Sequence, residues 1–431
     1  MNKLLRLAIC LTLLLSLRAE SRAQVDKGFP HSIATPVIKS SPKSLTLLTD
    51  TNPARALLPP ASPTIKAYNQ TWYGLYFCGV TWEILGLALM LRFRIGPRLR
   101  EYFESRTRFR LLQVAGFYAA YSLYLAVWHL PIAFFGHSVD RSYGFARQSM
   151  DLWLLDRCRG YLLGLPSLFA VWFGYWLLKR SPNRWWLWLW MGAVPCIVAQ
   201  SALWPVLIAP MYNRFVPMPQ SPLRNRILET ARKAGVEGAQ VYVVDISRRT
   251  TKLNAYVAGL GPTKRIVIWD TTLKALTEDE IVGIIGHELG HYVLHHVWQN
   301  VISSCVGAFV ILWLLSKALP WAVGRFGSKF GINDSYDMGG LPLISLMLYI
   351  VLILQTPIES AISRYHEHEA DRFGLQLTGL NDATAHAFAA FMSRDFADPD
   401  PPRFVVLWFY SHPPLRERVD FALSYKPNEA R

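Results

Sequence analysis

The stretch TEDEIVGIIGHELGHYV at residues 277–293 decides what the rest of the chain must build around. Thr277 and Glu280 have the spacing of a capping box, which predicts that a helix begins there. No proline follows as far as residue 298, so the helix can continue through 278–298. Because residues four apart share one face of a helix, His287 and His291 can direct two imidazoles at one ion.

The sequence His287-Glu288-Leu289-Gly290-His291 is an H-E-x-x-H motif, in which two histidines bind zinc and the glutamate activates water. Catalytic zinc usually has a third protein ligand and one open position. Segment 359–371 is dense in candidates for it, namely Glu359, His366, Glu367, His368, Glu369 and Asp371. Spacing does not choose among them, but Asp371 shares a helical face with Glu367 and could orient a ligating histidine, which favours Glu367. His295 and His296 are expected at the surface or behind the ligands.

Three glycines recur along the same predicted helix, at Gly283, Gly286 and Gly290. Each costs on the order of 1 kcal/mol of helix propensity relative to alanine. A helix with no special neighbour would avoid that cost. The stripe therefore predicts the close approach of another backbone.

The composition places this helix in a membrane protein. Of 431 residues, 52% are hydrophobic and 17% are charged, which excludes a disordered chain and disfavours an ordinary soluble enzyme. Six apolar segments approach the roughly 20 residues that cross a bilayer. They lie at about 72–92, 111–135, 160–178, 185–209, 301–320 and 341–357. The predicted fold class is mainly α, a polytopic helical membrane protein with a zincin-type catalytic domain that contains a small β-sheet, whose strands are expected at 241–244, 255–258 and 265–269.

The expected domain organisation follows from these segments. Residues 1–23 have a basic start, an apolar middle and small residues at the end, which is typical of a signal peptide or an N-terminal anchor. A Pro/Ser/Thr-rich linker is predicted over 24–70 and a four-span membrane domain over 71–210. The catalytic domain with the HExxH helix covers 211–300, two further spans 301–357, and the rest of the catalytic domain 358–431.

The net charge of +15 predicts the orientation. Seven arginines lie between Arg92 and Arg110, and both ends of that stretch adjoin predicted spans. This arrangement is typical of a cytoplasmic loop that obeys the positive-inside rule, and it disfavours a nucleic-acid surface. Alternation then places 179–184 and 317–340 inside and the catalytic segments outside the cytoplasm. The signal-like start further suggests a bacterial inner membrane.

Polar residues inside the predicted spans leave two interpretations open. Glu83 and His129 would belong either to an ion path or to a structural hydrogen bond between helices. The five cysteines include no C-x-x-C pair, so a Cys-type zinc site or a disulfide framework is unsupported.

Several motifs in order give the chain, from about residue 72 to 425, a resemblance to the type 1 CAAX prenyl protease family of integral-membrane zinc endopeptidases. The motifs are HELGH at 287–291, Ser363-Arg364-x-x-Glu367-x-x-Ala370-Asp371, Ser411-His412-Pro413-Pro414-Leu415-x-Glu417-Arg418 and Asn254-Ala255-Tyr256. Each motif other than HELGH is weak alone, whereas their order and spacing together are specific.

The resemblance implies roles for matching residues. Glu367 would be the third ligand of one Zn²⁺ per chain, with Asp371 as its supporting acid. Glu288, His412 and Arg418 would be catalytic, with His412 stabilising the oxyanion, and Asn254, Ala255 and Tyr256 would bind extended substrate. The implied partners are the lipid bilayer and a membrane-associated or CAAX-type polypeptide, with no nucleic acid. The family's eukaryotic members face the cytosol, which opposes the charge-based orientation. The alternative function is a membrane transporter or scaffold with a structural or regulatory zinc site.

Overall fold

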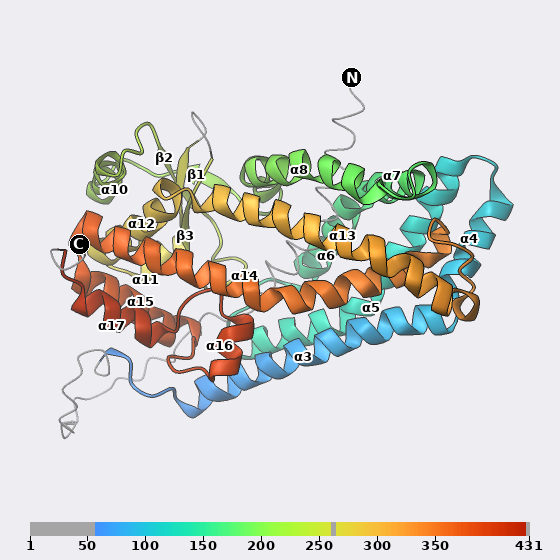
Figure 1. Ribbon diagram of the computed structural model, residues 1–431. Helices are drawn as coiled ribbons and strands as arrows, with labels where there is room; N and C mark the ends of the chain where they lie inside the picture. The colour runs from blue at the N-terminus through green and yellow to red at the C-terminus, as the bar shows by residue number, and fades with distance from the viewer. Residues whose placement is uncertain (1–56, 260–263, 428–431) are drawn as a thin grey trace.

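Long helices dominate the computed structural model, which describes residues 57–259 and 264–427. The predicted signal peptide or anchor at 1–23 and most of the predicted linker lie outside these residues. Helices α3 (Pro63–Arg92), α5 (Arg110–Ser142), α13 (His296–Phe330) and α14 (Leu341–Thr378) run along the length of the molecule in Figure 1. The α6 (Met150–Gly164), η1 (Leu165–Ser167), α7 (Leu168–Arg180) and α8 (Trp185–Leu203) segments complete the elongated helical part.

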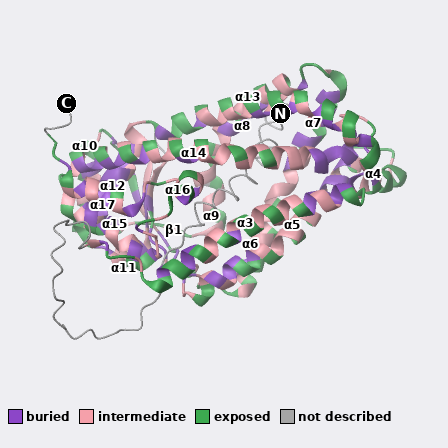
Figure 2. Cartoon of the chain, turned by 60° about the horizontal axis from the view of Figure 1, so that its bottom comes forward, coloured by how far each residue is buried: buried purple, intermediate pink, exposed green. Residues whose placement is uncertain are grey.

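The six predicted membrane spans are confirmed as long apolar helical segments. Six candidate spans lie in the described residues, and only 17–33% of each apolar stretch is buried within the protein. Figure 2 shows exposed residues along the outward faces of these helices. Apolar surface on this scale requires a nonpolar environment, so the helices belong in a bilayer.

The bounds of several segments differ from those predicted. Helix α3 begins at Pro63, inside the predicted linker, because the Ser62 side chain caps it and proline suits its first turn. The predicted span 160–178 is part of a longer segment that a 3₁₀ turn around Pro166 interrupts. The predicted span 185–209 contains α8, a π-helical turn at Trp204–Ile208 and the start of α9 (Ala209–Tyr212).

The three segments predicted to lie inside, at 92–110, 179–184 and 317–340, gather at one end of the molecule. They lie around α4 (Ile95–Arg106) and are called the basic loops below. An ion pair joins Arg100 to Asp337, which precedes the short η4 turn (Met338–Gly340). The Nε of Arg94 donates to the carbonyl of Lys329 at 3.0 Å, and Lys179 lies 5.9 Å from the centre of the Tyr336 ring. These contacts agree with the prediction that the three loops lie on the same side of the membrane.

A small mixed sheet lies at the opposite end. Its order is β1-β2-β4-β3, formed by Phe215–Pro217, Gln240–Val244, Arg265–Trp269 and Ala255–Ala258 respectively. Strands β2 and β4 are parallel, and β3 runs antiparallel to β4 at an edge. The three predicted strands are confirmed, whereas the short β1 was missed because it has only three residues. The expected turn after β3 reaches residues 260–263, outside the described part.

The helices around the sheet form one hydrophobic core with it. They are α10 (Pro222–Lys233), α11 (Asp270–Ala275), α12 (Glu278–Val293), α15 (Asn381–Asp395) and α17 (Leu415–Ser424), and the short α16 (Arg403–Phe409) packs against α14. Fully buried members of the core include Ile266, Ile268, Ile281, Ile285, Leu289, Phe388 and Val419. This core fixes α12 between the sheet and the C-terminal helices.

The predicted helix over 278–298 is interrupted. Its start is confirmed, because Thr277 and Glu280 form the capping box. However, α12 ends at Val293, and His295 takes a left-handed conformation with φ of 59° before α13 begins at His296. The break redirects the chain from the end that holds the sheet into a membrane helix. Neither proline nor glycine marks it in the sequence.

Glu83 and His129 contact each other between α3 and α5, with Oε1 and Nδ1 2.5 Å apart. The neighbouring Trp82 and Trp128 rings stack, and each donates a hydrogen bond to the backbone carbonyl of the other residue. Of the two interpretations, the structure favours a hydrogen bond between helices. The four cysteines in the described residues form no disulfide with one another.

Candidate active site

The glycine stripe of α12 lets α14 approach it closely, as the sequence predicted. A Cβ atom at Gly286 would lie 3.2 Å from the carbonyl oxygen of Gly374. At Gly290 it would lie 3.0 Å from the Cα of Ala370. This proximity sets the first two candidate ligands, on α12, directly against the carboxylates of α14.

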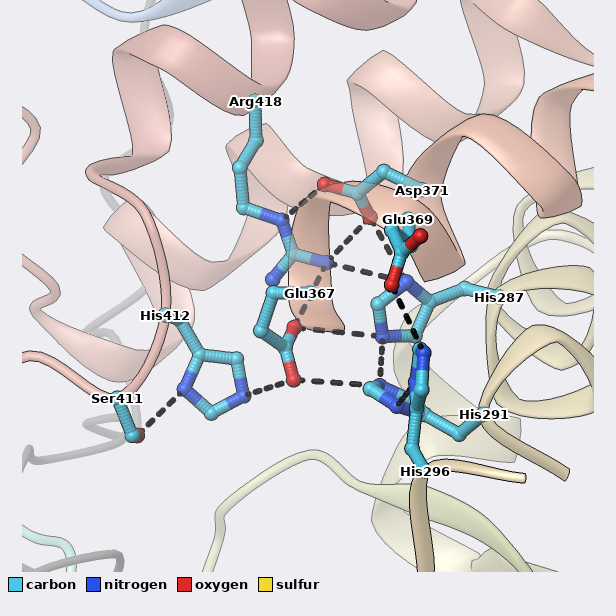
Figure 3. A network of polar contacts seen from close by, with 9 residues as sticks. All are labelled: His287, His291, His296, Glu367, Glu369, Asp371, Ser411, His412 and Arg418. Atoms are coloured by element: carbon cyan, nitrogen blue, oxygen red, sulfur yellow. Dashed lines mark hydrogen bonds and ion pairs between the residues drawn. The ribbon is translucent and has the colours of Figure 1, made fainter. Parts of the chain in front are cut away.

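Three side chains converge where the helices meet. The Nε2 atoms of His287 and His291 are 3.1 Å apart. Glu367 Oε2 lies 3.4 Å from His287 Nε2, and Glu367 Oε1 lies 3.2 Å from His291 Nε2. One donor atom from each residue lies within 4.8 Å of the others. The structure thus brings together the three residues predicted to bind the metal (Figure 3).

The donor set fits a zinc ion. Two imidazoles and one carboxylate are three of the ligands that zinc takes in catalytic sites, with a further position open. Glu367 Oε2 is buried and has no hydrogen-bond partner among the described residues. Because a buried carboxylate oxygen that accepts no hydrogen bond is costly, a bound cation would satisfy it.

Asp371 and Arg418 support the cluster from behind. His287 Nδ1 lies 2.7 Å from Asp371 Oδ1, while Arg418 donates to the same carboxylate from Nε at 2.9 Å and Nη2 at 2.6 Å. The Arg418 guanidinium also lies 4.1 Å from the centre of the Phe388 ring. All these groups are buried, so the position of the imidazole is determined by both packing and charge.

The carboxylates around His287 strongly affect the pKa of its imidazole. Burial alone would lower its pKa, but the carboxylates of Glu367 and Asp371 outweigh this effect and raise the pKa to about 10. Burial raises the pKa of Glu288, which lies next to His287 on α12, even though both histidines lower it. A glutamate with a raised pKa is better suited to accept a proton near neutral pH than an exposed one.

His412 enters the cluster from the loop before α17. Its Nε2 lies 3.4 Å from Glu367 Oε1, and its Nδ1 is 2.8 Å from the hydroxyl oxygen of Ser411. Figure 3 shows Glu367 between His412 and the two histidines of α12. The His412 side chain is 54% exposed, whereas the Arg418 side chain is 8% exposed. His412 is therefore accessible to a substrate, whereas Arg418 is covered.

The other ligand candidates on α14 lie outside the cluster. Glu359 accepts a hydrogen bond from Gln355 at 2.8 Å, and His368 packs against the ring of Phe421. Glu369 and His366 instead contact His296. The helical period explains this separation, because Glu367 and Asp371 face α12 while Glu369 points to a neighbouring face.

The predicted substrate strand occupies an edge of the sheet. Ala255 and Tyr256 belong to β3, which packs beside α12, and Asn254 immediately precedes it. The backbone N–H of Asn254 donates to Thr272 Oγ1 at 2.8 Å, and its carbonyl accepts from the N–H of Trp269 at 3.0 Å. This geometry is compatible with β-strand addition, and the substrate-binding role remains a prediction.

Two further residues support the cluster: Arg364, which belongs to one of the family-like motifs, and His296, which was expected at the surface or behind the ligands. Arg364 donates from Nη1 to the carbonyls of Val406 and Tyr410, which ties the loop before His412 to α14. His296, which was grouped with His295, is only 1% exposed and contacts His291, whereas His295 is exposed. The break between α12 and α13 separates these adjacent histidines, and the sequence carries no clear signal for it.

Comparison with known proteins gives consistent similarities. Residues 217–426 match peptidase family M48, and residues 64–214 match the family described as CAAX prenyl protease N-terminal, five membrane helices. An uncharacterized metalloprotease of Bacillus subtilis is 32% identical over 375 residues, which cover 87% of this chain and 88% of the relative. CAAX prenyl protease 1 of Saccharomyces cerevisiae is 29% identical over 319 residues, covering 69% and 68% respectively.

The fold also has a solved counterpart. The crystal structure of S. mikatae Ste24p aligns with a TM-score of 0.74 and covers 97% of this chain and 99% of its own. The sequence identity in that alignment is 21%, so the likeness concerns the fold.

Proposed function

The chain belongs to peptidase family M48, with the membrane region of the CAAX prenyl proteases, and is a metalloendopeptidase of the membrane; from this premise we propose that zinc is its metal and membrane-associated polypeptide its substrate. The observation that carries the proposal is the convergence of His287, His291 and Glu367 beside Glu288. One zinc ion per chain would be held by these three residues.

Zinc, when bound, supplies a Lewis acid that activates water and the scissile carbonyl. Glu288 accepts the proton of the attacking water and passes it to the leaving amine nitrogen. His412, which is exposed on the other side of Glu367, donates a hydrogen bond to the carbonyl oxygen as negative charge develops there. Contacts of this type contribute about 3–4 kcal/mol in other enzymes.

We assign Arg418 a different part from the one that the resemblance implied. Its guanidinium is buried and held by Asp371, which suits a supporting role. Arg418 instead positions Asp371, which in turn holds the His287 ring. Its positive charge also partly balances Glu367, whose Oε2 lies 3.4 Å from its Nη2.

The proposed substrate class follows from where the cluster lies. His291 is separated from membrane helix α13 by only a short turn, and Glu367 belongs to the same continuous helix as a membrane span. A peptide bound along β3 would therefore be cleaved close to the bilayer. Because one relative is named CAAX prenyl protease 1, a CAAX-type protein is one candidate substrate. Other membrane proteins, cleaved during their maturation or quality control, are the other candidates.

The alternative function, a transporter or scaffold with a structural or regulatory zinc site, is not favoured. Structural zinc sites are usually closed by four protein ligands. Here three ligands converge, and the HExxH motif provides a base that a structural site would not use. The intramembrane residues Glu83 and His129 contact each other between two helices, as a structural hydrogen bond would.

Substitution of Glu288 by glutamine tests the chemistry. The purified protein in detergent should cleave an unfolded polypeptide, and Glu288→Gln should lower turnover by about 10²–10⁴-fold with zinc content unchanged. Glu278→Gln is the matched control, because Glu278 is exposed at the start of the same helix. Normal turnover by Glu288→Gln would refute the proposed role of Glu288. Cleavage that survives complete zinc removal would refute the requirement for zinc.

A further inference from the structure

The two histidine ligands have different partners at their second ring nitrogen. His287 Nδ1 faces the Asp371 carboxylate at 2.7 Å, the usual arrangement for a histidine that binds a metal. His291 Nδ1 instead faces the Nδ1 of another histidine, His296, at 2.9 Å. The mechanism described above does not use His296, although it is almost completely buried.

The ligand geometry determines which way this contact must run. Because Nε2 of His291 points into the metal cluster, its proton belongs on Nδ1, which therefore donates. His296 must accept at Nδ1, so its own proton lies on Nε2. That buried nitrogen lies 3.4 Å from Glu369 Oε2, an ion-pair contact without hydrogen-bond geometry. A carboxylate at this position favours the Nε2–H tautomer of His296.

The His296 ring is also held on its face. The His366 ring stacks on it with centroids 4.3 Å apart and planes inclined by 12°. His366 Nε2 lies 3.0 Å from Gln299 Oε1, and Gln299 Nε2 donates to the carbonyl of Leu294 at 2.9 Å. Leu294 caps the C-terminus of the zinc-binding helix α12. The network therefore connects α12, α13 and α14 around a single imidazole (Figure 3 shows its metal side).

We propose that His296 is a positioning residue for His291, and that Glu369 and His366 hold it in the orientation and tautomer in which it accepts the Nδ1–H of that ligand. The two ligands of α12 are thus oriented by different devices, a carboxylate behind His287 and a histidine–carboxylate pair behind His291. The inference rests on the proposal that His287, His291 and Glu367 bind zinc.

The test is the zinc affinity of purified full-length variants, measured by competition with a chelator. His296→Leu removes the acceptor and should weaken zinc binding about 10–100-fold, the range observed when such supporting partners are lost. His296→Asn should stay within a few-fold of wild type, since its amide oxygen can take the place of Nδ1. His295→Asn is the matched control, because that side chain is exposed and asparagine tolerates its left-handed backbone.

The thermal unfolding of the metal-free proteins separates positioning from packing. The expected result is a similar unfolding temperature for metal-free wild type, His296→Asn and His296→Leu, with affinity lost only in the last. Unchanged affinity in His296→Leu would overturn the proposal, as would an equal loss in His296→Asn. If His296→Leu does not fold, Glu369→Leu replaces it, with a several-fold loss expected and unchanged affinity contradicting the proposal. Absence of zinc binding in wild type would instead refute the proposed function.

Discussion

The environment of His287 links metal binding to pH. Two carboxylates raise the pKa of this imidazole to about 10 in the metal-free protein, so it carries a proton at neutral pH. The metal must displace that proton, because only the neutral ring can bind it. In the unfolded chain the same ring would titrate near 6.5.

We expect the apparent zinc affinity to rise with pH, by up to about tenfold per unit below pH 10, as His287 loses its proton more readily. Competition with a chelator of known proton affinity at pH 6, 7 and 8 measures this dependence. The raised pKa also stabilises the metal-free fold, fully below pH 6.5 and less and less towards pH 10. A zinc affinity that is flat over this range would contradict the assignment.

At this scale the sequence was sufficient to choose most of the cluster. HExxH spacing predicted His287, Glu288 and His291, and the helical period favoured Glu367 over Glu359 and Glu369. Spacing could not reveal which of two adjacent histidines turns inward, since that depends on a left-handed residue at the end of α12. It also could not show that Arg418 is covered by its own partners.

The packing of α12 against α14 is the decisive contact between elements. Along this interface each helix approaches the other's backbone at a glycine, because a Cβ at Gly374 would lie 2.6 Å from the backbone nitrogen of His287. That distance leaves no room for a side chain. The stripe on α12 could be predicted from the sequence, whereas the identity of the helix it meets required the structure.

Adding one methyl group at this interface should disturb both stability and metal binding. We expect Gly374→Ala to destabilise the protein by about 1–3 kcal/mol and to weaken zinc binding, because His287 must move. Gly286→Leu should be more disruptive. Gly324→Ala is the control on α13, where a Cβ meets nothing within 4 Å, and it should be neutral or slightly stabilising. Thermal unfolding in detergent that is equal for Gly374→Ala and the control would contradict the close contact.

On the scale of the whole molecule, the basic loops and the metal cluster lie at opposite ends. The basic loops around Arg100, Lys179 and Lys329 contact one another at the end remote from the sheet and the metal cluster. The six spans could be predicted from the length and hydropathy of the apolar segments. The bends at Pro166 and after Leu203 could not be predicted, because local packing determines how each segment ends.

We predict that the basic end faces the cytoplasm and the catalytic end faces away from it, in the inner membrane of a bacterium. A reporter fused after Pro217 should show the activity typical of an extracytoplasmic location. The matched control is a fusion between Arg92 and Arg110, which should report a cytoplasmic one. The opposite pair of results would favour a cytosol-facing active site.

The order of the metal-binding residues along the chain has a consequence for biosynthesis. His291 is made before α13 and Glu367 at the far end of α14, and both intervening helices contain membrane spans. The third ligand therefore reaches the other two only after the chain has entered and left the bilayer between them. A newly made chain can therefore assemble the proposed metal site only after both helices have been made.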